Sequence, residues 1–188
     1  QGGEETRRGG NYDLSGMFDM YAVAESTPTS VTLRVDTGGF RITRALSLAE
    51  DRPMLQVAVT AENITDKPQD LTLRSHTEFD LGPLATTQVH FVNRLGDAAH
   101  PKMDTIIAGL REGEYYLDEH APKNAWTFTG DKGLTVTQRF EDTTLDFAWL
   151  YAFPETLGAL DAEIWRKPET VAPGASIALQ HELEIATR

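Results

Sequence analysis

Hydrophobic and polar residues alternate along most of this chain, in short runs that end at turn-forming residues. Residues 125–129 (AWTFT) and 134–140 (LTVTQRF) are two such runs, joined by the tight turn GDKG. Residues 31–35 (VTLRV) and 40–48 (FRITRALSL) flank a second turn, DTGG. Alternation with a period of two is typical of half-buried β-strands, and a glycine-containing turn between two alternating runs predicts a β-hairpin.

Further runs of the same kind bring the candidate strands to about ten, with turn signals about every eight to twelve residues. No segment shows convincing helical amphipathicity, and residues 103–110 fit either a strand or a helical turn. The pattern therefore predicts an all-β fold, an antiparallel β-sandwich or a barrel. Residues 1–16 contain five glycines and predict a flexible N-terminal segment, and residues 17–188 have the length of a single β-sandwich domain.

One alternating run, residues 71–82 (LTLRSHTEFDLG), ends in residues that can do chemistry. His76, Glu78 and Asp80 stand close together at its end, which predicts a polar site at the exit of a strand; a solvated strand end gives the same pattern. A second run, residues 160–165 (LDAEIW), carries Glu163. Acid–base catalysis needs a donor and an acceptor with separated pKa values. His76 and Glu163 form such a pair if the fold brings them together; otherwise Glu163 is the solvent side of its strand.

Composition narrows the class of partner. With 29 acidic and 17 basic residues the formal charge is -12, and no cluster of Lys and Arg offsets it. Such a surface repels phosphate and anionic lipid, so we expect neither nucleic acid nor a membrane as a partner, and a neutral carbohydrate suits the charge better. The absence of cysteine excludes thiolate sites, and the five histidines are scattered, so we expect no metal and no cofactor.

Aromatic side chains could serve a sugar, because they pack against its C–H surfaces. Trp126 and Trp165 lie near turns and are the candidates for this role, while Glu78 and Asp80 are candidates for contacts with sugar hydroxyls. Trp149 lies inside the apolar run LDFAWLYAF, and we expect it in the core. Core packing is the alternative interpretation for each tryptophan.

The order of these motifs resembles the aldose 1-epimerase (galactose mutarotase) family. In that family a strand, an Asn-containing turn and a second strand lead to a His-x-x-Phe-Asn-Leu segment. Here Asn63 stands in the turn, and His76, Phe79 and Leu81 match the segment, with Asp80 in place of its Asn.

Later segments extend the resemblance. In LDAEIWRKPE, Glu163 and Pro168 match a family segment in which a glutamate follows an apolar strand and precedes a proline. The turn VAPGAS at residues 171–176 precedes a final alternating strand, as in many members of this superfamily. The resemblance covers roughly residues 31–185. The family's longer N-terminal half, with an arginine and a further histidine that help to hold the sugar, has no clear match here.

The resemblance implies a large twisted antiparallel β-sandwich of the mutarotase type, the supersandwich. It also implies that His76 is the general acid that protonates the ring oxygen and that Glu163 is the general base that takes the proton of the anomeric hydroxyl. The same fold is used without this activity, as a sugar-binding or accessory module beside glycosidases and lyases.

Three functions therefore stay open at this point. The chain is a carbohydrate-binding sandwich, free-standing or part of a larger sugar-processing protein; an aldose 1-epimerase; or a structural sandwich without a small ligand. The chain opens with Gln1. A processed terminus there implies a secreted or periplasmic protein, and an unprocessed one the cytoplasm. The oligomeric state is not determined by the sequence.

Overall fold

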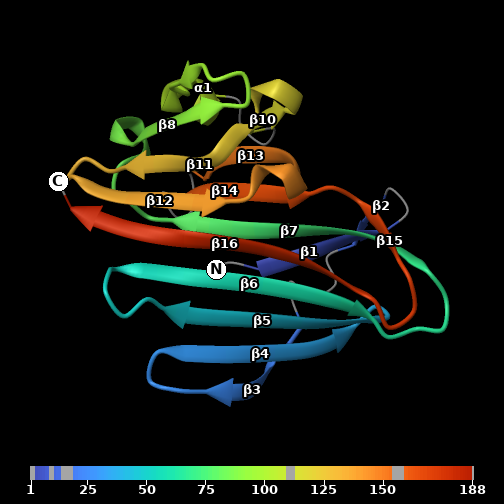
Figure 1. The fold of residues 1–188 in the computed structure, drawn as a ribbon. Helices are drawn as coiled ribbons and strands as arrows, with labels where there is room; N and C mark the ends of the chain where they lie inside the picture. Colours follow the sequence, from blue (N-terminus) through green and yellow to red (C-terminus); the bar gives the residue numbers. More distant parts are fainter. Residues whose placement is uncertain (1–2, 9–10, 14–18, 109–112, 154–158, 188) are drawn as a thin grey trace.

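The computed structural model describes residues 3–8, 11–13, 19–108, 113–153 and 159–187. Most of these residues lie in two antiparallel sheets (Figure 1). Nine strands form the larger sheet, in the spatial order β3-β4-β5-β6-β16-β12-β11-β8-β9. Their bounds are Ala22–Ser26 (β3), Ser30–Thr37 (β4), Phe40–Leu48 (β5), Met54–Asn63 (β6), Gln88–Asn93 (β8), Ala98–Ala99 (β9), Pro122–Thr129 (β11), Leu134–Phe140 (β12) and Ser176–Thr187 (β16).

The second sheet has seven strands, in the order β10-β13-β14-β7-β1-β2, with β15 paired to β7 as well. Their bounds are Gly3–Arg8 (β1), Asn11–Asp13 (β2), Gln69–Phe79 (β7), Glu114–Leu117 (β10), Leu145–Phe153 (β13), Ala159–Arg166 (β14) and Glu169–Val171 (β15). Within the described residues, helical structure is limited to α1 (Met103–Ala108) and three 3-10 turns at Leu84–Thr86, Asp118–His120 and Asp142–Thr144. The sequence of residues 103–110 is compatible with either a strand or a helical turn, and the structure has the helix α1 at the start of this range.

The two sheets confirm the predicted all-β antiparallel sandwich, and both predicted hairpins form. β4 and β5 pair up to Thr37 and Phe40, and β11 and β12 pair up to Thr129 and Thr135. In the β4–β5 turn, φ is 56° at Gly38 and 86° at Gly39. Positive φ at both central residues suits the right-handed twist of the strands, and glycine adopts it without a steric cost.

The N-terminal segment corrects one prediction. Instead of a flexible stretch over residues 1–16, residues 3–8 form β1, which pairs with β7 from Gly3 opposite His76 to Arg7 opposite Thr72. Residues 11–13 form β2 against β1. Local composition did not reveal these strands, because β2 pairs only with β1, and the partner of β1, β7, lies about 70 residues further along the chain. The other residues of this stretch lie outside the described residues.

Apolar side chains from both sheets form one buried cluster between them. Leu71 and Leu73 of β7 point into it, together with Phe128 of β11 and Leu179 of β16, all almost fully buried. Such a core accounts for the alternation of the strands, since every second residue faces the opposite sheet.

A polar network crosses this core. Ser75 Oγ of β7 lies 2.8 Å from Nε2 of His181 on β16, and Gln138 Nε2 on β12 lies 3.4 Å from Nδ1 of the same ring. Gln138 Oε1 accepts the indole N–H of Trp126 at 2.5 Å. Burial lowers the pKa of His181 to about 3, so the ring is neutral at physiological pH. These bonds satisfy polar groups that are costly to bury alone and fix β7 against the nine-stranded sheet.

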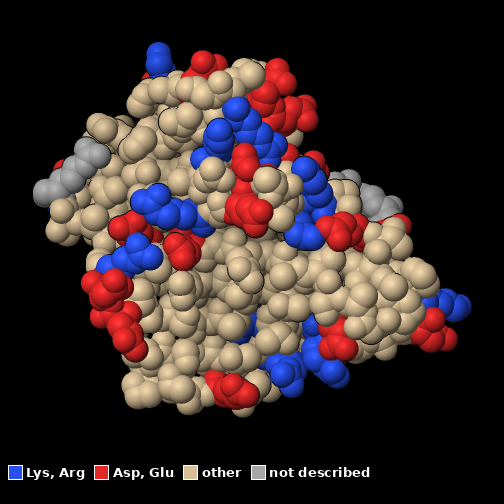
Figure 2. All heavy atoms as spheres, viewed as in Figure 1, with Lys and Arg blue, Asp and Glu red and all other residues tan. Residues whose placement is uncertain are grey.

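Lys and Arg side chains are interspersed with Asp and Glu on the face seen in Figure 2. None of the helices in the described residues has the length and apolarity to span a membrane.

Candidate functional site

Charged side chains gather where β7 and β14 pair in the seven-stranded sheet. Arg74, His76 and Glu78 alternate along β7, and Asp161 and Glu163 alternate along β14; we call these five residues the charged cluster. His76 pairs directly with Glu163, and Glu78 pairs with Asp161. Ser75, between Arg74 and His76, points inward and contacts His181 of the nine-stranded sheet. Because side chains alternate along a strand, the charged cluster lies on the opposite, outer face of the seven-stranded sheet. The two residues that the resemblance selects, His76 and Glu163, are therefore cross-strand neighbours.

The imidazole of His76 lies between carboxylates. Its Nε2 is 2.8 Å from Asp161 Oδ2 and 3.4 Å from Glu78 Oε1. Its Nδ1 is 3.4 Å from Glu163 Oε1. Both ring nitrogens thus face carboxylate oxygens within the protein, and the ring is held in one orientation.

Glu163 is held on both of its carboxylate oxygens. Arg74 Nη1 donates to Oε1 at 2.5 Å, and the indole N–H of Trp165 donates to Oε2 at 2.8 Å. The Arg74 guanidinium also lies over the Trp165 ring, 5.0 Å from its centroid. Arg74 is 3 % exposed and Glu163 is 0 % exposed, so this ion pair is withdrawn from water.

Burial and mutual contact shift the pKa values of the cluster. Burial raises the pKa of Glu163 to about 7, against the pull of Arg74 in the opposite direction. Burial also raises the pKa of Asp161. For His76, burial lowers the pKa, but contact with Asp161 and Glu163 more than offsets it and the net shift is upward. Glu163 therefore exchanges its proton near neutral pH, as the groups of acid–base sites do.

We expect the raised pKa of Glu163 to make the stability of the folded protein depend on pH. Between the ordinary pKa of 4.5 and the folded value of about 7, native Glu163 keeps a proton that the unfolded chain has released. The free energy of unfolding therefore falls as pH rises through this window. Glu163→Gln removes that titration, so its stability depends less on pH between pH ~5 and ~8 in urea titrations. An unchanged slope in the variant contradicts this assignment.

The ligand atoms of His76, Asp161 and Glu163 lie within 4.8 Å of one another. One imidazole and two carboxylates are suitable donors for a divalent cation. In this arrangement, however, Arg74 and His76 already offset part of the carboxylate charge. The absence of a metal and of a cofactor stays a prediction.

An unbroken chain of aromatic rings lies beside the charged cluster on the same face. The order is Trp165, Phe147, Tyr115, Trp149 and Tyr151, and the successive ring centroids are 5.1, 5.9, 5.5 and 5.4 Å apart. We call these five residues the aromatic band. Tyr115 is 56 % exposed, and Phe147, Trp149 and Tyr151 are half-buried. The band presents apolar surface to solvent next to the carboxylates.

The strand register joins the band to the cluster. Tyr115 of β10 pairs with Trp149 of β13, Trp149 pairs with Glu163 of β14, and Glu163 pairs with His76 of β7. One straight row across four strands thus runs from an exposed aromatic ring to the buried acid–base pair. At the edge of the row, a Cβ on Gly113 would come within 2.3 Å of Trp149 Nε1, so only glycine fits there.

The predicted sugar-binding residues are only partly brought together. Glu78 belongs to the cluster, whereas Asp80 is exposed and accepts the backbone N–H of Gly82 in a turn. Trp165 is 5 % exposed and supports Glu163. Trp126 is 0 % exposed in the other sheet and offers no face to a sugar, so the structure corrects that prediction. It also corrects the core assignment of Trp149, which lies on the outer face.

Sequence reasoning missed Arg74, Asp161 and every member of the aromatic band except Trp165. A signal for them was present. Arg74 and Asp161 each stand two residues before a predicted site residue, and residues two apart on a strand share a face. The same spacing relates Phe147 and Tyr151 to Trp149.

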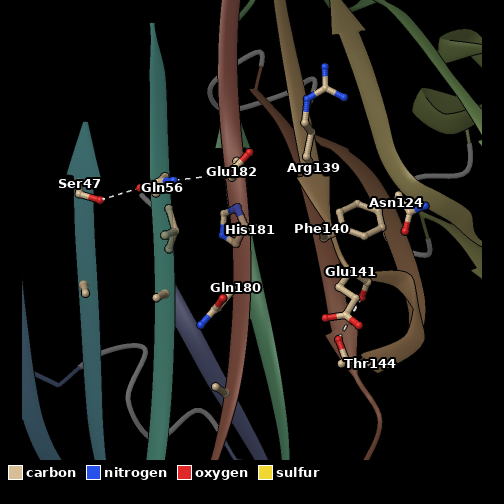
Figure 3. A pocket seen from close by; sticks show the side chains of 14 residues that line it. Ser47, Gln56, Asn124, Arg139, Phe140, Glu141, Thr144, Gln180, His181 and Glu182 are labelled. Carbon is tan, nitrogen blue, oxygen red and sulfur yellow. Dashed lines mark hydrogen bonds between the residues drawn. The ribbon is translucent and has the colours of Figure 1, made fainter. Parts of the chain in front are cut away.

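A hollow of about 840 Å³ lies on the outer face of the nine-stranded sheet (Figure 3). Ser47, Gln56 and Glu182 form a hydrogen-bonded ladder across β5, β6 and β16, with Gln180 beside it. Small side chains lie in its lining: Ala45, Ala58 and Ala178. Among the described lining residues, the two that carry a ring, Phe140 and His181, are both buried. The hollow thus offers polar groups without an exposed ring.

No family model matches this chain, and no curated protein matches it in sequence. Solved structures do match. A galactose mutarotase related enzyme from Lactobacillus acidophilus has a TM-score of 0.70 and 13% identity over 97% of this chain and 78% of that one. The GalM/aldose epimerase homologue from C. elegans has a TM-score of 0.70 and 14% identity over 96% of this chain and 74% of that one. This chain has the mutarotase-like fold. The resemblance predicted from the motifs is confirmed at the level of the fold.

The mutarotase-like fold also occurs within larger enzymes. The GH36 α-galactosidase AgaA from Geobacillus stearothermophilus, solved with stachyose, matches with a TM-score of 0.64 and 9% identity. That match covers 98% of this chain and 30% of AgaA. At such identities the similarity describes the fold alone, and the function has to be argued from the site.

Proposed function

We propose that this chain binds a carbohydrate on the outer face of its seven-stranded sheet, over the aromatic band and beside the charged cluster. The observation that carries the proposal is the row that joins exposed Tyr115 and half-buried Trp149 to the polar groups of β14 and β7. Sugars bind where ring surfaces meet their C–H groups and polar side chains meet their hydroxyls. The formal charge of -12 favours a neutral sugar over an anionic one.

The similar structures support the same ligand class. The protein from Lactobacillus acidophilus is described as a galactose mutarotase related enzyme, and AgaA was solved with stachyose and with raffinose. Since this chain matches 30% of AgaA, we propose that it serves either alone or as the sugar-binding module of a longer sugar-processing protein.

Removing an exposed ring tests the proposal. We expect a thermal-shift screen with neutral mono- and oligosaccharides to raise the melting temperature of the wild type, because a ligand of the folded state stabilises it. Tyr115→Ala should weaken the affinity about tenfold, as expected for the loss of a stacked ring together with its buried surface. Tyr115→Phe keeps the aromatic ring, so this variant should retain most of the affinity for the sugar.

Leu95→Ala is the matched control. Leu95 is 60 % exposed, close to the 56 % of Tyr115, and lies between β8 and β9 of the nine-stranded sheet, whereas the band belongs to the seven-stranded sheet. An equal loss of affinity in both alanine variants contradicts the proposed location. A flat screen in the wild type favours a structural sandwich without a small ligand.

An aldose 1-epimerase is the second candidate, and one observation favours it. The ring oxygen and the anomeric hydroxyl are bonded to the same carbon, so their acid and base must be neighbours, and His76 Nδ1 lies 3.4 Å from Glu163 Oε1. Binding without catalysis ranks first because both nitrogens of His76 face protein carboxylates, and Glu163 is fully buried.

Anomer exchange separates the two candidates. The epimerase predicts that the wild type accelerates the mutarotation of a pure anomer of glucose or galactose in polarimetry, and that His76→Gln abolishes the effect. The binding module predicts sugar-dependent stabilisation with no acceleration. In that case His76→Gln changes stability more than it changes affinity.

A further inference from the structure

The length of the aromatic band bears on the size of the ligand. Phe147, Trp149 and Tyr151 are alternate residues of β13 and share its outer face. With a rise of about 3.4 Å per residue, they extend over about 14 Å of strand. A pyranose ring is similar in size to a phenyl ring, so one sugar unit covers about one member of this row.

From this we infer that the site takes a neutral oligosaccharide, with successive sugar units along β13, and not a free monosaccharide. The inference rests on the proposed function and names the substrate class of the same site. Tyr115 widens the row at Trp149, because the two rings stack with centroids 5.5 Å apart and planes 21° apart. The exposed surface is thus greatest in the middle of the row.

The polar groups support the same orientation. β14 runs next to β13 over its whole length, with Asp161 opposite Tyr151 and Glu163 opposite Trp149. A saccharide along β13 therefore has aromatic rings beneath it and the charged cluster along one side. Within that cluster Glu78 is the more accessible group, with 17 % of its side chain exposed, against 9 % for His76.

Charge selects the kind of oligosaccharide. The cluster contains three carboxylates, Glu78, Asp161 and Glu163, against one permanent cation, Arg74. Uronic acid units alongside it would meet like charge in a poorly solvated place. Neutral units carry no such penalty, so we expect neutral chains to bind more tightly than uronate chains of equal length.

A chain-length series tests the inference. Isothermal titration calorimetry of the wild type is performed with cello-, malto-, xylo- and galacto-oligosaccharides from the monomer to the hexamer, and with oligogalacturonate. In the series that binds, we expect affinity to rise about two- to tenfold for each of the first units added, and then to level off. Tyr151→Ala should remove the gain from the added units and leave the affinity for the shortest ligand nearly unchanged. Gln180→Ala, in the hollow of the other sheet, should follow the wild type.

The other outcomes are distinct. Affinity that is independent of chain length, or a chain-length gain that survives Tyr151→Ala, overturns this inference and leaves sugar binding intact. Tighter binding of oligogalacturonate overturns the charge argument. A series in which no saccharide binds contradicts the proposed function itself. Loss of the gain in Gln180→Ala moves the oligosaccharide to the nine-stranded sheet.

Discussion

Replacement of Arg74 by alanine is expected to lower the free energy of unfolding by about 3–5 kcal/mol, measured by urea denaturation. The expected loss is large because Arg74 donates to Glu163 at 2.5 Å, and neither residue is exposed by more than 3 %. Without the guanidinium, a carboxylate stays buried beside Asp161 with less positive charge to offset it. Adding Glu163→Gln to the variant should recover part of the loss, since it removes the unpaired charge.

Arg139→Ala provides the matched control. Arg139 also pairs with a glutamate on the neighbouring strand, at 2.9 Å from Glu184, but its side chain is 51 % exposed. Surface ion pairs contribute little, so we expect a change of at most about 1 kcal/mol. Equal losses in Arg74→Ala and Arg139→Ala contradict the view that the charged cluster is a buried, mutually dependent unit.

Replacement of Trp126 by alanine is expected to cost a similar amount, about 3–5 kcal/mol, because a fully buried ring leaves a cavity. The ring packs edge-on against Phe128, with centroids 5.3 Å apart, and its N–H satisfies Gln138. Loss of the indole therefore also leaves a buried amide oxygen without its donor. Chemical denaturation of the variant measures the sum of these effects.

Trp149→Ala is the comparison, since Trp149 is only half-buried on the outer face. We expect a smaller loss of stability and a larger loss of sugar affinity than in Trp126→Ala, provided that affinity is measured where both variants are folded. The reverse order contradicts the assignment of Trp126 to the core and of Trp149 to the site.

The alternation of the sequence was sufficient to predict the all-β class and both hairpins, because adjacent strands need only local turn signals. It did not provide the pairing of β7 with β14, which brings His76 opposite Glu163 across 87 positions of the chain. That register depends on which strands become neighbours, which local alternation does not specify.

The tryptophans show where an alternating pattern is ambiguous. β13 carries apolar residues on both faces, so the run LDFAWLYAF does not reveal which set is inward. The small and aliphatic residues Ala148 and Leu150 face the core, and the aromatic residues face outward. On β11, Trp126 is two residues before Phe128, so both side chains lie on the same face of the strand and point into the core. Proximity to a turn was therefore a poor guide to exposure.

The indole N–H signals of the three tryptophans give the most direct test of the proposed site. Trp126 lies in the core, Trp165 bonds Glu163 within the cluster, and Trp149 lies in the middle of the band. In a ¹H–¹⁵N correlation spectrum, each signal is assigned by its loss in a Trp→Phe variant and is followed as neutral oligosaccharide is added. We predict that the Trp149 signal moves most and that the Trp126 signal stays in place. Saturation by a sugar that leaves Trp149 unmoved would contradict carbohydrate binding on this face.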